Sequence, residues 1–105
     1  MVNHYETVFI MTPVLSDEQM KETVSKFEKI LLDNQCKIVH QENWGMRKLA
    51  YPIDKKSSGF YHLFEFKAEG SFVKEWEVQF KRDEKILRFL TVALDKHGIQ
   101  FNEKR

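Results

Sequence analysis

The stretch GMRKLAYPIDKKSSGFYHLFEFKA, residues 45–68, contains the signals that decide the fold. Its first part has strand character but includes Pro52, which has no N–H to donate to a neighbouring strand, so this strand belongs at the edge of a sheet. Its last part, from residue 60, carries apolar side chains on both faces, as a strand in the middle of a sheet does. Residues 55–59, KKSSG, favour a turn between the two. The stretch therefore predicts a hairpin that joins an edge strand to a central strand.

Three further segments have the residue types of strands. Residues 4–11 and residues 85–94 are rich in β-branched and aromatic side chains. Residues 36–44 alternate in polarity and lead into the hairpin, with an interruption at Gly45 where a bulge or bend is expected. Residues 98–105 have no such pattern and are expected to form a frayed end. Together with the hairpin, these segments predict four strands.

Two segments have the spacing of amphipathic helices. Residues 17–33 place apolar side chains at helical intervals, and Ser16 with Gln19 forms the signature of a capping box at their start. Asn34 is expected to end this helix. A second helix is expected with Ser71 as its N-terminal cap. Its apolar stripe consists of Val73, Trp76 and Phe80.

The order of these elements is β-α-β-β-α-β in a chain of 105 residues, which is the length of one domain. Right-handed crossovers place both helices of such a chain on one face of a four-stranded antiparallel sheet, with the first and third strands in the middle. The sequence thus predicts an α+β fold of the ferredoxin-like type, in a single domain over residues 1–105.

Such a fold leaves one face of the sheet without helices. The two central strands would place four apolar or aromatic side chains there, namely Val8, Ile10, Tyr61 and Leu63. An uncovered patch of this kind is a candidate docking surface for a partner. Apolar residues exposed singly are also normal in folded proteins, so strand parity alone leaves both interpretations open.

Composition excludes several classes of protein. The chain is 42% hydrophobic and 31% charged, which is typical of a globular domain rather than a disordered segment. It has no apolar run of the roughly 18 residues that a membrane helix needs, and its first residues lack the features of a signal peptide, so a cytoplasmic protein without membrane association is expected. The single cysteine, Cys36, can form no internal disulfide and is expected to be a buried thiol.

The residues that carry chemistry do not form a catalytic pattern. The four histidines have no metal-ligand spacing, and the chain has no glycine-rich phosphate loop or nucleophile elbow. His62 shares a strand face with Phe64 and Phe66, where a satisfied, semi-buried histidine is expected. We therefore expect no enzyme, no metal site, no cofactor and no small-molecule substrate.

Positive charge is concentrated from residue 45 onward, because residues 1–44 carry a net charge of −3 and residues 45–105 a net charge of +4. In the hairpin, four cations lie on either side of Tyr51, namely Arg47, Lys48, Lys55 and Lys56. Cations neutralise RNA phosphates, and an aromatic ring can stack on an unpaired base. The same composition also suits an edge strand that lysines and a proline protect from aggregation.

A second basic set surrounds the end of the second helix and comprises Lys81, Arg82, Lys85 and Arg88. Cations at a helix C-terminus interact favourably with the helix dipole and need no ligand. Arg88 differs because it stands inside the apolar run ILRFL, where a charge needs a partner or solvent. Arg88 is therefore the most informative of the four.

The stretch GMRKLAYPI resembles a G-x-R-x-L-A-Y-P-I motif in the family of the sixth protein of the bacterial small ribosomal subunit. Three other blocks resemble that family in the same order: YETVFIMTP at residues 5–13, GFYHLFEF at 59–66 and KRDEKILRFL at 81–90. The resemblance covers nearly the whole chain. It implies a ferredoxin-like, non-catalytic structural protein that is bound to the ribosome in the cytoplasm.

The resemblance also implies partners. They are the central domain of 16S ribosomal RNA and the eighteenth small-subunit protein, which would form a heterodimer with this chain during assembly. RNA contacts are then expected from Arg47, Lys48, Tyr51, Lys55, Lys56 and Arg88. Partner-protein contacts are expected from Val8, Ile10, Tyr51, Tyr61 and Leu63. The third strand lacks the aromatic-glycine signature of RNA-recognition domains, so base stacking on the sheet face is not part of this expectation.

The alternative from another class is a ferredoxin-like regulatory or ligand-sensing homodimer that associates through the open sheet face. It would form a defined dimer without RNA and would be stabilised by its ligand. An acylphosphatase-like enzyme of similar topology is disfavoured, because residues 12–19, TPVLSDEQ, contain no glycine or arginine for a phosphate loop.

Overall fold

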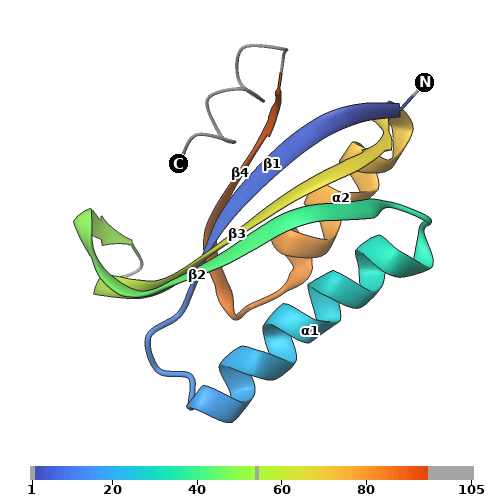
Figure 1. The fold of residues 1–105 in the computed structure, drawn as a ribbon. Helices are drawn as coiled ribbons and strands as arrows, with labels where there is room; N and C mark the ends of the chain where they lie inside the picture. Colours follow the sequence, from blue (N-terminus) through green and yellow to red (C-terminus); the bar gives the residue numbers. More distant parts are fainter. Residues whose placement is uncertain (1, 54, 95–105) are drawn as a thin grey trace.

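The computed structural model describes residues 2–53 and 55–94 (Figure 1). Its elements are β1 (Val2–Met11), α1 (Asp17–Asp33), β2 (Lys37–Ile53), β3 (Lys56–Glu69), α2 (Gly70–Arg82) and β4 (Ile86–Ala93). This is the β-α-β-β-α-β order that the sequence predicts. The frayed end expected at residues 98–105 lies outside the described residues.

The four strands form one antiparallel sheet in the order β2-β3-β1-β4. Both helices cover the same face of this sheet (Figure 1). The first and third strands are therefore central, and β2, which contains Pro52, lies at an edge, so the ferredoxin-like prediction is confirmed. The face without helices is called the open face below.

The core lies between the sheet and the helices and consists mainly of aromatic rings. The rings of Phe27 on α1 and Phe80 on α2 stack with their centroids 4.2 Å apart. Trp76 is fully buried, and its indole N–H donates to Thr7 Oγ1 at 2.9 Å, so the polar atom of this large side chain is satisfied. This packing holds both helices against the central strands. The open face takes no part in it and is therefore available for contacts with other molecules.

The start of α1 has the predicted capping box. Ser16 Oγ accepts from the backbone N–H of Gln19 at 3.2 Å, and Gln19 Oε1 accepts from the backbone N–H of Ser16 at 3.0 Å. The prediction of Ser71 as the cap of α2 is wrong. This helix begins at Gly70, and its N-cap residue Glu69 makes no side-chain capping bond. Glu69 still pairs with β1, so the strand leads directly into the helix without a linker.

The β2–β3 hairpin follows the predicted strands but turns more tightly. Gly45 has a φ of 72° at a register shift in β2, which is the expected bulge. The turn predicted over residues 55–59 is too long, because β3 already begins at Lys56 and Gly59 pairs with Arg47. Lys56 to Gly59 are polar or small, but the outer part of a hairpin needs no apolar face in order to form backbone hydrogen bonds.

Candidate nucleic-acid interface

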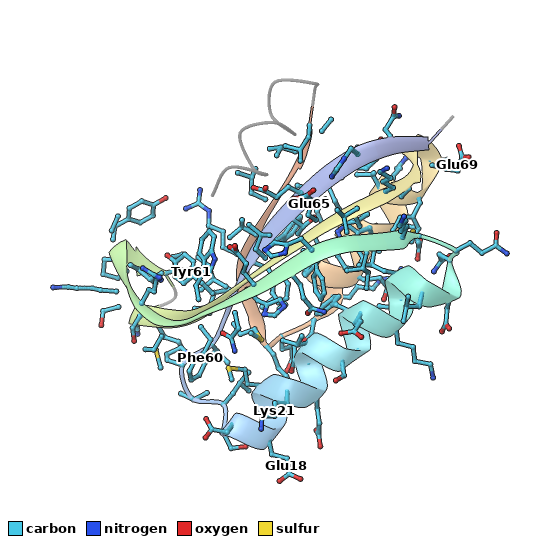
Figure 2. All side chains as sticks on the ribbon, in the orientation of Figure 1. Glu18, Lys21, Phe60, Tyr61, Glu65 and Glu69 are labelled. Carbon is cyan, nitrogen blue, oxygen red and sulfur yellow. The ribbon has the colours of Figure 1, made fainter. Side chains whose placement is uncertain are left out.

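The open face is formed by every second residue of the strands. Figure 2 shows Phe60 and Tyr61 on opposite sides of β3, with Phe60 towards the helices and Tyr61 on the open face. Strand pairing places Ile10 beside Tyr61 and Arg88 beside Ile10. The face therefore presents a row of side chains that crosses β3, β1 and β4.

Exposure separates the residues predicted to contact a partner protein. Val8 and Tyr61 are half-buried, but Ile10 is 8% exposed and Leu63 only 1%. The expectation that Ile10 and Leu63 contribute to an exposed apolar surface is wrong for the isolated chain. The hairpin tip lies over Ile10, and Leu63 lies between its strand partners Val8 and Glu42. The apolar side chains that are exposed on this face are on the edge strand β4, where Leu90 is 65% exposed and Val92 40%.

The tip of the β2–β3 hairpin curves back over the open face. Leu49 is 7% exposed, although it lies far from the helices. A hollow of about 100 Å³ separates the tip from the sheet, and its lining residues are Ile10, Leu49, Ala50, Tyr51, Ile53, Tyr61 and Arg88. Buried Leu49 and half-buried Ile53 therefore attach the tip to the sheet, which explains why the LAYPI segment is not polar throughout.

Arg88 and Tyr51 come from distant parts of the sequence and meet at this hollow. The Arg88 guanidinium donates a hydrogen bond to the Tyr51 hydroxyl, and its central carbon lies 5.7 Å from the centre of the Tyr51 ring. The hydrogen bond to Tyr51 raises the pKa of Arg88 above its ordinary value. Both side chains are exposed, so the structure brings two predicted RNA contacts into one cationic and aromatic surface.

The hairpin cations extend this surface. Arg47, Lys48 and Lys55 are exposed and Lys56 is half-buried. The Arg47 guanidinium lies 5.8 Å from the centre of the Trp44 ring. Trp44 in turn stacks on Tyr61, with ring centroids 6.2 Å apart. Trp44 was not among the residues selected from the sequence, although an aromatic residue just before a predicted bulge is a usable signal.

The opposite end of the open face has a different character. His4 Nε2 and Glu65 Oε2 lie 2.6 Å apart, and their side chains are 9% and 8% exposed. Glu65 is labelled in Figure 2, above the sheet and away from the hairpin. Among the described residues, no group of three or more histidine, cysteine or acidic side chains is arranged to hold a metal ion. The open face thus has a cationic and aromatic end near the hairpin tip and a paired polar end.

The family model described as ribosomal protein S6 matches residues 4–93. The chain belongs to this family. Small ribosomal subunit protein bS6 of Flavobacterium johnsoniae is 56% identical over 99% of this chain and 92% of its own length, and that of Christiangramia forsetii is 57% identical over 99% and 93%. A crystal structure of 30S ribosomal protein S6 from Thermotoga maritima matches with a TM-score of 0.88 at 29% identity, over all of both chains.

Membership in the ribosomal protein S6 family establishes the class of protein. The chain is a structural, non-enzymatic protein of the small ribosomal subunit, so it works on the ribosome in the cytoplasm. None of the helices in the described residues is both long and apolar enough to span a membrane.

Proposed function

We propose that this chain binds the central domain of 16S ribosomal RNA as a heterodimer with the eighteenth small-subunit protein during subunit assembly. The observation that carries the proposal is the meeting of Arg88 and Tyr51 beside the hairpin cations. One surface thereby offers positive charge for phosphates and an exposed ring for a base. The RNA contacts proposed are Arg47, Lys48, Tyr51, Lys55, Lys56 and Arg88.

The partner protein is proposed to dock on the neighbouring part of the open face. Of the predicted residues, Val8, Tyr51 and Tyr61 have accessible surface, whereas Ile10 and Leu63 would support the contact from below. A hollow of about 250 Å³ on this face is lined by Val8, Ile10, Arg88, Phe89 and Leu90, which gives an apolar side chain of the partner a place to insert. Arg88 borders both this hollow and the hairpin surface. Docking of the partner protein would therefore order an arginine that contacts the RNA, and RNA binding would order an arginine that contacts the partner protein.

A salt titration tests the RNA part of the proposal. The variant carries alanine at Arg47, Lys48, Lys55 and Lys56, and the control carries alanine at four exposed helix lysines, Lys21, Lys29, Lys74 and Lys81. Each phosphate contact contributes about 0.7–0.9 to the slope of log affinity against log salt, so the hairpin variant should lose about 3 units of slope. The control has the same change of net charge and should lose much less. Equal slopes for wild type and hairpin variant across the titration would contradict the proposal.

A further inference from the structure

Trp44 and Arg47 form an aromatic and cationic pair that strand alternation does not predict. In a regular strand, two residues three positions apart point to opposite faces. The bulge at Gly45 changes this, because its φ of 72° accompanies a register shift between Asn43 and Gly45. Trp44 stacks on Tyr61 of the open face, and Arg47 lies over Trp44, so both side chains lie on that face.

We propose that Trp44 and Arg47 form a binding site for an unpaired base of RNA. The base would stack on the accessible part of the indole in place of the Arg47 guanidinium, which would move aside and contact the phosphate or the ring of the base. The proposal rests on the RNA-binding function proposed above and adds to it a site of base stacking on the sheet face.

The Trp44 ring is held in one orientation. Its indole N–H donates to Glu42 Oε2 at 2.7 Å, and its ring lies 19° from the plane of Tyr61. Trp44 is half-buried, so part of its surface remains accessible. A ring that is already ordered loses little conformational freedom when a ligand stacks on it, which favours binding.

The charges around the pair favour an anionic ligand. Arg47 is exposed, and a second exposed cation on the open face, Arg88, is in register with Ile10, which pairs with Tyr61, the stacking partner of Trp44. The Glu42 carboxylate beside the pair accepts from the Trp44 indole N–H through one oxygen, and its other oxygen lies 3.0 Å from His40 Nε2, so both oxygens are already engaged by neighbouring side chains. An unpaired nucleotide combines a flat aromatic ring with a negative charge, and both features match this site.

The affinity test uses the central-domain 16S RNA fragment in the presence of the eighteenth protein. Trp44→Ala should weaken RNA binding about 5-fold to 150-fold, the range expected for the loss of one base stack. The salt slope should stay unchanged, because stacking releases no counterions, whereas Arg47→Ala should lower it by about 1. Trp44→Phe keeps a ring and should recover most of the affinity. Met46→Ala, a 48% exposed neighbour whose strand partner is Phe60, is the matched control.

A fluorescence measurement observes Trp44 in the wild-type complex, so it does not require the Trp44→Ala variant to fold. The chain has two tryptophans, and Trp76 is fully buried in the core. RNA should therefore quench the emission of Trp44 in the wild-type complex, and the difference from the Trp44→Phe complex isolates this signal.

The outcomes separate the two proposals. Failure of the wild-type complex to bind RNA at any salt concentration would overturn the proposed function, and this site with it. RNA binding that is the same for Trp44→Ala and Met46→Ala, without quenching, would overturn only the base site. Loss of heterodimer formation in Trp44→Ala without RNA present would also overturn it, because Trp44 would then be a protein contact.

Discussion

Acid should destabilise this protein through His62, which is 4% exposed and packs against the rings of Phe9 and Phe64. The Gln41 side-chain nitrogen donates to Glu28, so its oxygen, 3.0 Å from His62 Nε2, accepts the histidine proton. Nδ1 is then a buried lone pair without a hydrogen-bond partner among the described residues. A proton added there would be a buried charge, so burial lowers the pKa of His62 to about 4, against the opposite effect of Glu28.

The sign and size of the effect follow from the two pKa values of His62. The unfolded chain takes up the proton near pH 6.5 and the folded chain only near pH 4. Between these values the unfolded state binds more protons, so stability falls as the pH falls through this window. The loss is about 2 kcal/mol at pH 5 and about 3 kcal/mol below pH 4. A domain of this size has a total stability of about 5–15 kcal/mol, so the effect is large.

Urea unfolding at pH 7.5 and pH 5.0 measures this loss. His62→Gln retains an N–H donor for Gln41 but does not titrate, so the wild type should lose about 2 kcal/mol more than this variant between the two pH values. His4→Gln, at another little-exposed histidine, controls for the loss of a histidine in general. The same pH dependence in the wild type and in His62→Gln would refute the argument from burial.

Three further predictions concern packing and access. Gly59→Ala should lower the free energy of unfolding by about 1–3 kcal/mol, because the added Cβ would lie 2.4 Å from Ile10 Cγ2. An unchanged midpoint of urea unfolding would contradict this close approach. Ser16→Ala should lower the free energy of unfolding by about 1 kcal/mol, because the backbone N–H of Gln19 loses its hydrogen bond to the Ser16 hydroxyl. A melting temperature equal to that of the wild type would contradict a stabilising role of this cap. Cys36 is 6% exposed, and burial raises the pKa of its thiol. A disulfide reagent should therefore label Cys36 only as the protein unfolds. Immediate labelling of the folded protein would contradict this burial.

The fold could be predicted because several local signals agree. Pro52 requires an edge strand, and the capping box at Ser16 fixes the start of the first helix. The cap of α2 could not be predicted in the same way. Ser71 has a good capping side chain, but β3 remains paired with β1 as far as Glu69, and this pairing sets where the helix begins. Tertiary contacts of this kind are not visible in a local pattern.

The candidate site was predictable in composition but not in geometry. The hairpin cations and Arg88 were identified from the sequence, yet their meeting through Tyr51 depends on the curvature of the hairpin over the sheet. The burial of Leu63 could not be predicted in this way. The alternation of side chains along a strand shows which face of the sheet a residue points to, but it does not show whether other side chains cover that residue. Trp44 was missed because the bulge at Gly45 changes which side chains share a face.

The most direct test of the account measures binding to a central-domain 16S RNA fragment by gel shift, with and without the eighteenth small-subunit protein, at two salt concentrations. We predict tight, salt-sensitive binding when both proteins are present and much weaker binding for this chain alone, because each surface by itself has modest affinity. A stable homodimer that binds no RNA under any of these conditions would contradict it and would favour the regulatory alternative.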